Sequence, residues 1–164
     1  MKLPLTIHLI IHFLTGILSG LIVYLLWHQA LISFAGGIIG AFFIDLDHFI
    51  DYLLVFKLKF RLNYFFGGYA FIKSSKLYIF FHGFEISMIE ILISLTISNF
   101  ILKSFLLSIG LGSLFHLVSD VWMNHIPFKT YWLTFRLLNN FNVKKLITDK
   151  EYQKHIEDKR RLGY

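Results

Sequence analysis

The segment Ile44-Asp45-Leu46-Asp47-His48-Phe49-Ile50-Asp51 places three carboxylates and an imidazole directly after an apolar run. Ionisable groups at membrane depth are costly, so they are kept mainly where they face a bundle interior, pair with one another or bind ions. Asp and His are also side chains that hold divalent metal ions. The segment therefore predicts a metal centre in a protein that lies in a bilayer.

The composition indicates an integral membrane protein. The chain has 164 residues, enough for one compact domain, and it is 56% hydrophobic and 16% charged, with a mean hydropathy of +0.64. A soluble domain carries about 25% charged residues, so this chain has too few to cover its surface. Cysteine is absent, which excludes a disulfide framework, a thiolate nucleophile and a Cys-based zinc site.

Four apolar stretches have the roughly 20 residues that a spanning helix needs, at 5–27, 30–50, 77–98 and 101–122. The first has no small-residue cleavage site, so we expect a retained helix rather than a removed signal peptide. Glycines and serines recur in three of the stretches and provide faces on which helices pack closely. We therefore predict an all-α bundle of four transmembrane helices within residues 1–126.

Two regions lie outside the predicted spans. Apolar and basic residues alternate in 52–76, which fits a strand that turns at Gly67-Gly68 into a short hairpin, or an interfacial loop with its aromatic side chains in lipid. In 127–164, aromatic and leucine residues recur at helical spacing among Lys129 and Arg136, and a charged end follows. This second region resembles an amphipathic interfacial helix followed by a charged cytoplasmic tail.

The basic residues predict the orientation. Lys2, five residues of 52–76 and nine residues of the tail from Pro127 leave only Lys103, at the turn between the last two spans. With four spans, the first three regions lie on one side, which the positive-inside rule identifies as the cytoplasm. We therefore expect a multi-pass protein of the cell membrane with both termini in the cytoplasm.

This topology brings polar side chains from all four predicted spans to the cytoplasmic end. Most of them are spaced i,i+3 or i,i+4, so they share helix faces, and four such faces can enclose an ion in a bundle core. A chance collection of unpaired charges at one depth is energetically unfavourable. The residues are His8, His12, Asp45, Asp47, His48, His82, Glu85, His116 and Asp120.

Two choices stay open among these residues. Asp45 and Asp47 point about 200° apart on an ideal helix, so both can bind one ion only if the helix ends or distorts there. Otherwise one of them orients a ligating histidine. Likewise, whichever of His8 and His12 is not a ligand is an ordinary interfacial histidine.

The motifs resemble those of the predicted inner-membrane, membrane-bound metal-dependent hydrolases, over about residues 8–125. That family shows an early His, a Pro-Asp-x-Asp-His segment, a His-Arg-x-x-Thr-His-Ser segment and a late His-x-x-x-Asp. Here Asp45-Leu46-Asp47-His48 matches the second segment, with Ile44 in place of the proline, and His116-x-x-x-Asp120 matches the fourth. The third is reduced to His82, with Glu85 in the place of a missing ligand or base.

The donor set and the resemblance together imply metal-assisted hydrolysis of a lipid ester or phosphoester at the cytoplasmic boundary of an inner membrane. One or two divalent ions are expected, and zinc fits the mixture of His and Asp. The basic 52–76 region and the tail would hold anionic lipid headgroups or simply anchor the chain. The predicted ligands are His12, Asp45, Asp47, His48, His82, His116 and Asp120, with Glu85 and Asp47 as catalytic candidates.

Two other functions fit the same polar layer. One is a small metal-ion or proton transporter or channel, although four short helices leave little room for alternating access and the charges occupy a single depth. The other is a metal-stabilised membrane scaffold without turnover. Nucleic-acid binding is not expected despite a net charge of +6, because the Lys and Arg residues flank membrane spans and no binding module is recognisable.

Overall fold

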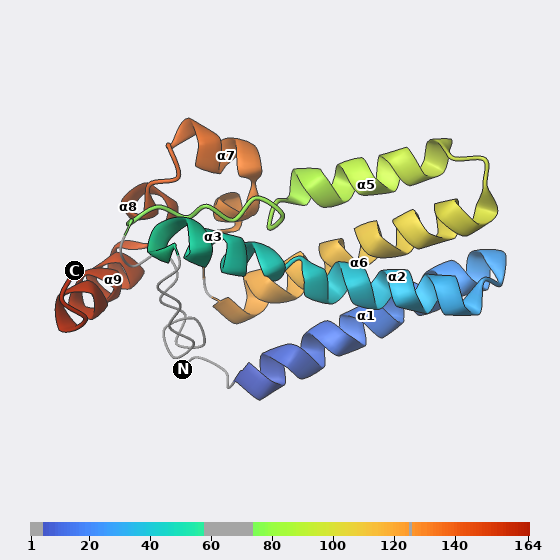
Figure 1. Ribbon diagram of the computed structural model, residues 1–164, viewed down its shortest axis with the longest axis horizontal. Helices are drawn as coiled ribbons and strands as arrows, with labels where there is room; N and C mark the ends of the chain where they lie inside the picture. The colour runs from blue at the N-terminus through green and yellow to red at the C-terminus, as the bar shows by residue number, and fades with distance from the viewer. Residues whose placement is uncertain (1–4, 58–73, 125) are drawn as a thin grey trace. The chain divides into compact units, whose positions relative to one another are not determined.

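The computed structural model describes residues 5–57, 74–124 and 126–164, and over these residues it is all-helical apart from one isolated bridge between Lys76 and Asn142 (Figure 1). Two compact units can be distinguished: unit 1 is Met1–Ile44 with His82–His125, and unit 2 is Asp45–Phe81 with Ile126–Tyr164. Unit 1 contains α1 (Leu5–Trp27), α2 (Ala30–Phe43), α5 (Phe84–Thr96) and α6 (Phe100–Asn124). Unit 2 contains α3 (Leu46–Phe56), η1 (Phe128–Tyr131), α7 (Leu133–Leu138), α8 (Val143–Leu146) and α9 (Asp149–Arg161).

Three stretches of the described chain are long and apolar enough to cross a membrane: Thr6–Trp27, Ala30–Ile50 and Phe100–Asn124. They coincide closely with three of the four predicted spans. Large apolar side chains on these helices stay exposed, for example Leu25 at 63% and Leu31 at 82%. Exposed apolar surface of this extent is expected where lipid, rather than water, surrounds the helices.

The predicted small-residue packing is confirmed within unit 1. There α1, α2 and α6 contact one another, and α5 packs on α6. A Cβ atom at Gly37 would overlap the carbonyl oxygen of Gly16, and one at Gly40 would overlap the carbonyl of Ile109. Because glycine has no Cβ, the backbones of these helices approach much more closely than larger residues would allow.

The predicted span 77–98 is only partly helical. Helix α5 has 13 residues, which corresponds to about 20 Å, against the roughly 30 Å of a hydrocarbon core. It begins after Gly83, whose backbone is extended at φ −123° and ψ 125°. The apolar residues before it serve another purpose, because Leu77 and Ile79 form a buried cluster of unit 2 with two residues of α8. One apolar run in the sequence therefore divides between two units.

The alternation in 52–76 does not produce a strand in its described part. Helix α3 continues to Phe56, and the rings of Tyr52 and Phe56 stack on one buried helix face with their centroids 4.7 Å apart. The prediction of a strand is therefore wrong for residues 52–56. Residues 58–73, which include the predicted turn at Gly67-Gly68, lie outside the described residues.

The tail forms four short helical elements rather than one amphipathic helix followed by a charged end. The first break is at Trp132, whose extended backbone separates η1 from α7. Arg136, which the sequence places among the polar residues of an interfacial helix, is fully buried. Its Nη1 group donates a hydrogen bond to the carbonyl of Ile79, so the cation stabilises the non-helical segment that precedes α5.

Candidate metal centre

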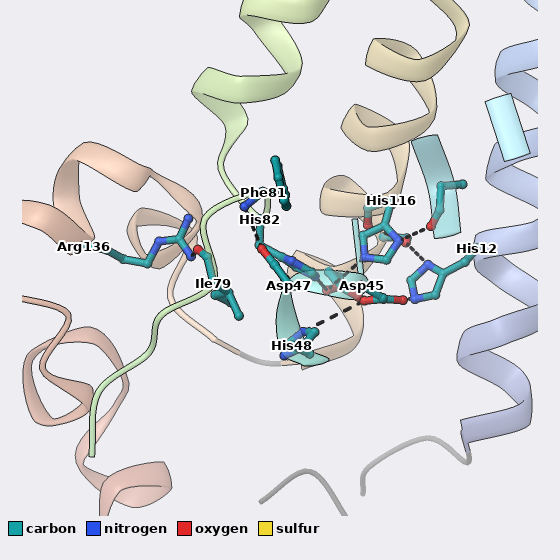
Figure 2. Close-up of polar contacts among 12 residues, drawn as sticks. His12, Asp45, Asp47, His48, Ile79, Phe81, His82, His116 and Arg136 are labelled. Carbon is teal, nitrogen blue, oxygen red and sulfur yellow. Dashed lines mark hydrogen bonds and ion pairs between the residues drawn. The ribbon is translucent and has the colours of Figure 1, made fainter. Parts of the chain in front are cut away.

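Three histidines of unit 1, which are labelled in Figure 2, come from three separate segments. Their Nε2 atoms all lie near the carboxylate of Asp120. His12 lies on α1, His82 lies two residues before α5, and His116 and Asp120 lie one turn apart on α6. All four are buried, with exposed fractions of 4%, 1%, 0% and 6% respectively. Buried ionisable groups need partners or an ion, so this cluster is the functional candidate of unit 1.

The distances within the cluster suit a shared ion better than direct hydrogen bonds. The Nε2 atoms of His12, His82 and His116 lie 3.7, 4.0 and 3.6 Å from the carboxylate oxygens of Asp120. A hydrogen bond between such atoms spans about 2.7–3.2 Å. Ligand atoms that surround one tetrahedral zinc at about 2.0–2.2 Å are separated by about 3.3–3.6 Å. The ligand atoms of His82, His116 and Asp120 all lie within 4.8 Å of one another, so a small contraction of these three would accommodate one divalent ion. His12 faces the other oxygen of the same carboxylate.

The tautomer of His116 also suits metal binding. Its Nδ1 atom lies 2.7 Å from the backbone carbonyl oxygen of Ala41, which can only accept a hydrogen bond. Nδ1 therefore carries the hydrogen, and in the neutral imidazole Nε2, the atom that faces Asp120, carries the lone pair. Metal-ligating histidines are commonly oriented in this way by a carbonyl at the other ring nitrogen. The close contact at Gly40 brings the Ala41 carbonyl within reach of α6.

His12 is held by its neighbours on α6. Its ring, which is labelled with that of His116 in Figure 2, stacks on the His116 ring. The ring centroids are 3.8 Å apart and the planes 18° apart. Ser119 Oγ donates its only hydrogen to the His116 carbonyl oxygen at 2.7 Å. The same oxygen lies 3.5 Å from His12 Nδ1, and toward this atom it can only accept a hydrogen bond. This arrangement again leaves the lone pair of a histidine on Nε2, facing Asp120.

His8 and His12 differ in how deeply their side chains are buried. His8 lies one turn earlier on α1, is half-buried, and has its ring centroid 6.2 Å from that of His12. One ligand atom from each of His8, His12 and Asp120 lies within 4.8 Å of the others. Both histidines are therefore near the carboxylate, but His12 is the one enclosed among the other ligands.

Asp45, Asp47 and His48 belong to unit 2 and have two different environments. Helix α2 ends at Phe43 and α3 begins at Leu46, so the helix is interrupted beside Asp45. Such an interruption is the condition under which Asp45 and Asp47 could bind the same ion. Asp45 Oδ1 lies 4.0 Å from His48 Nε2, and both side chains are partly exposed. Asp47 is fully buried, and its Oδ2 accepts a hydrogen bond of 2.7 Å from the backbone N–H of Phe81. The participation of these residues in a metal centre stays a prediction.

The two catalytic candidates lie outside the clusters of possible ligands. Within the part of the chain that the structure describes, neither Glu85 nor Asp47 is in a group of three or more ligand atoms within 4.8 Å. Glu85 is half-buried in the first turn of α5, three residues after His82. Its role as a base and that of Asp47 stay predictions.

Sequence reasoning missed the groups that orient the ligands. The Ala41 carbonyl has no side-chain signature, and Ser119 differs in no way from the packing serines of the same helix. Ser113 was also missed: its Oγ lies 3.4 Å from Glu90 Oε2 and donates at 2.9 Å to the carbonyl of Ile109. Ser113 therefore joins α6 to α5 through Glu90, about one turn from His116 toward the middle of α6.

Comparisons with protein-family models, with curated proteins and with solved structures find no match to this chain.

Proposed function

We propose that the chain is a multi-pass membrane protein that binds a divalent metal ion through His12, His82, His116 and Asp120 and hydrolyses a lipid ester or phosphoester. The convergence of three imidazole Nε2 atoms on one buried carboxylate is the observation that carries the proposal. Three nitrogen donors and one oxygen donor form a set that zinc favours. A divalent ion in such a site supplies Lewis acidity, which activates water at neutral pH.

The residues of the chain have distinct tasks in this proposal. The Ala41 carbonyl and Ser119 keep His116 and His12 in the tautomers that present Nε2, and Asp120 contributes the negative charge that a cation needs. Glu85 is the proposed general base, because it is half-buried in the first turn of α5 and follows His82 by three residues in the chain. Its carboxylate would accept the proton of the attacking water.

The proposed topology has four crossings, with the cluster on the cytoplasmic side. Phe84, the first residue of α5, lies two residues from His82, while Thr96, its last, is joined by three residues to Phe100 at the start of α6. That start is the far end of unit 1, where Lys103 Nζ lies 5.5 Å from the ring centroid of Trp27. Helix α5 therefore returns across the apolar part of the unit, which supports a crossing despite its length. The bias of Lys and Arg toward the other end supports cytoplasmic termini.

The surroundings of the cluster support a lipid substrate. Large apolar side chains beside His12 on α1 are exposed, including Ile10 at 53% and Phe13 at 47%. A substrate that reaches such a site from the bilayer has acyl chains, and a scissile ester at headgroup depth would lie near the cytoplasmic end of the helices. The basic residues of 52–76 and of the tail would attract anionic headgroups.

The experiment is a metal and activity measurement on the full chain purified in detergent. Bound metals are quantified by mass spectrometry, and a panel of lipid esters and phosphoesters is assayed with and without a chelator. We expect one or two zinc ions per chain and turnover that the chelator and His116→Ala both abolish. His28→Ala, which changes a histidine at the opposite end of α1, is the matched control and should retain both properties.

Other results would contradict the proposal in distinguishable ways. Absence of stoichiometric metal together with absence of chelator-sensitive turnover rejects it outright. Ion flux into liposomes that His116→Ala abolishes, without any hydrolysis, would show a transporter instead. Metal that raises the melting temperature without flux or turnover would show a scaffold. Metal counts for Asp45→Asn, Asp47→Asn and His48→Ala test whether these three residues add ligands.

A further inference from the structure

A second polar cluster lies in unit 2, outside the membrane spans, and joins segments that are far apart in the sequence. Ser75 Oγ lies 3.3 Å from His155 Nε2 and 2.9 Å from Lys159 Nζ. His155 is 8% exposed, whereas Ser75 and Lys159 are half-buried. The serine oxygen is therefore in contact with a buried imidazole and an ammonium, which is not an arrangement that core packing requires.

The fold fixes both sides of this cluster. Helix α9 begins at a Thr148 cap that accepts a hydrogen bond from the Glu151 N–H, and it presents His155 and Lys159 on one face because they are four residues apart. Ser75 has a left-handed backbone, with φ at 52°, and its carbonyl accepts a hydrogen bond of 3.1 Å from Val143 N–H. A left-handed conformation is unfavourable for serine and persists where surrounding contacts impose it, often at active sites.

The direction of the hydrogen bonds follows from counting protons. A lysine ammonium can only donate, so Ser75 Oγ accepts from Lys159. The single hydroxyl hydrogen is then available to His155 Nε2 in the tautomer that carries the lone pair on this atom. In this tautomer Lys159 donates to Ser75 and Ser75 donates to His155, which draws the hydroxyl proton toward the imidazole and places a positive charge beside the oxygen.

We propose that Ser75 is a nucleophile, with His155 as its general base and Lys159 as the cation that stabilises its alkoxide, in a second site that acts on carboxylic esters without metal. A nucleophile in hydrogen-bond reach of a base is the general signature of covalent catalysis. The protonation state of the base agrees with this role. Burial lowers the pKa of His155, and the nearby Lys159 lowers it further, while Asp158 opposes the shift, so the imidazole is neutral at pH 7.

The chemistry balances with water as the only co-reactant. Ser75 Oγ forms a bond to the ester carbonyl carbon while its proton moves to His155 Nε2. Collapse of the tetrahedral adduct breaks the bond to the alkoxy oxygen, which leaves as the alcohol with the proton from His155. Water then attacks the acyl-serine with His155 again as base, and the carboxylic acid and the free hydroxyl of Ser75 are released.

The test is covalent labelling of the full chain in detergent with a fluorophosphonate probe, in which Ser75 Oγ displaces fluoride from phosphorus. We expect labelling that mass spectrometry assigns to Ser75, that Ser75→Ala abolishes, and that Ser74→Ala leaves intact as the matched control. His155→Gln should slow labelling by about 100-fold or more, the usual contribution of a general base. Lys159→Met should slow it as well, whereas Lys154→Met, an exposed lysine of the same helix, should not.

A chelator separates this proposal from the metal-dependent function. We expect the rate of labelling to be the same with and without chelator, even where hydrolysis by the metal centre is lost. Wild-type protein that does not label, labelling that survives Ser75→Ala, or labelling that depends on metal would each overturn the proposal. Circular dichroism of Ser75→Ala and His155→Gln, compared with the wild type, confirms that the variants remain folded.

Discussion

The rings of His12 and His116 stack face to face with their centroids 3.8 Å apart, although they belong to the first and last helices of unit 1. Stacking fixes the relative orientation of both imidazoles, and each presents Nε2 to the carboxylate of Asp120. Neither ring can move alone without losing its contact with the other. The two histidines therefore form one preorganised wall of the metal centre.

Removal of a ligand should abolish tight metal binding. We expect His12→Ala, His82→Ala, His116→Ala and Asp120→Asn each to lower zinc affinity by at least about 100-fold, measured by competition with a chromophoric chelator. Ser119→Ala should lower it by about 10-fold, because the serine only orients His12. The double variant of His12 and His116 should lose little more than either single variant, because the rings act together. Unchanged affinity in two of the single ligand variants would contradict the assignment.

The position of the metal centre should depend on the close approach of α2 and α6. A methyl group at residue 40 would overlap the carbonyl of Ile109, so Gly40→Ala should force the helices apart. We expect a loss of about 1–3 kcal/mol in stability, typical of overpacking, together with weaker metal binding because the Ala41 carbonyl moves away from His116. Thermal unfolding in detergent, with and without zinc, measures both effects. Leu92→Ala on the exposed face of α5 is the control and should change neither.

Much of the fold can be predicted from local patterns. The three candidate spans follow from apolar length, and the close packing follows from the glycines of α1, α2 and α6, because both properties depend on single segments. The coming together of His12, His82, His116 and Asp120 could also be predicted, since helical spacing and the depth of each residue in its span are regular. The spacing of polar residues thus carries information about a site between helices.

The remaining features depend on contacts that no local pattern records. The apolar run at 77–98 has the composition of one span, but Gly83 ends the helix and Leu77 and Ile79 pack with α8 instead. Alternation within 52–76 predicted a strand or an interfacial loop, yet residues 52–56 are helical and the contact between Tyr52 and Phe56 favours a helix. The burial of Arg136 could not be predicted either, because its partner, the Ile79 carbonyl, is a backbone group far away in the sequence.

Loss of the Arg136 cation should destabilise the protein, because Arg136 donates a hydrogen bond to a buried backbone carbonyl. Arg136→Met would leave the Ile79 carbonyl buried without this donor. We expect a loss of about 1.5–3 kcal/mol in the free energy of unfolding, the range for hydrogen bonds to charged groups. Lys129→Met removes an exposed cation that lies 5.1 Å from the Phe135 ring centroid and should cost much less. The free energies of unfolding are measured by chemical denaturation in detergent. Equal losses in the two variants would show that the buried hydrogen bond contributes no more to stability than the exposed cation does.

The lowered pKa of His155 should make stability depend on pH in a defined direction. Burial and Lys159 lower this pKa below its usual value of 6.5, whereas Asp158 raises it. The ring of Tyr152 stacks on the His155 ring, with the centroids 6.1 Å apart. As the pH falls below about 6.5, the unfolded chain binds a proton at this imidazole and the folded chain does not, so folding becomes less favourable. Above about pH 7 the histidine is neutral in both states and its contribution is constant.

The measurement is the melting temperature of the wild type and of His155→Gln between pH 8 and pH 5, in the same detergent. All other groups are the same in both proteins, so the difference between the two curves isolates His155. We expect this difference to be flat above pH 7 and to change below about pH 6.5, with the wild type losing stability relative to the variant as the solution becomes more acidic. A difference that is constant from pH 8 to pH 5, or that grows in favour of the wild type in acid, would contradict the lowered pKa. Because Ser75 donates only to a neutral imidazole, the same acid range should also remove its contact with His155 and slow fluorophosphonate labelling.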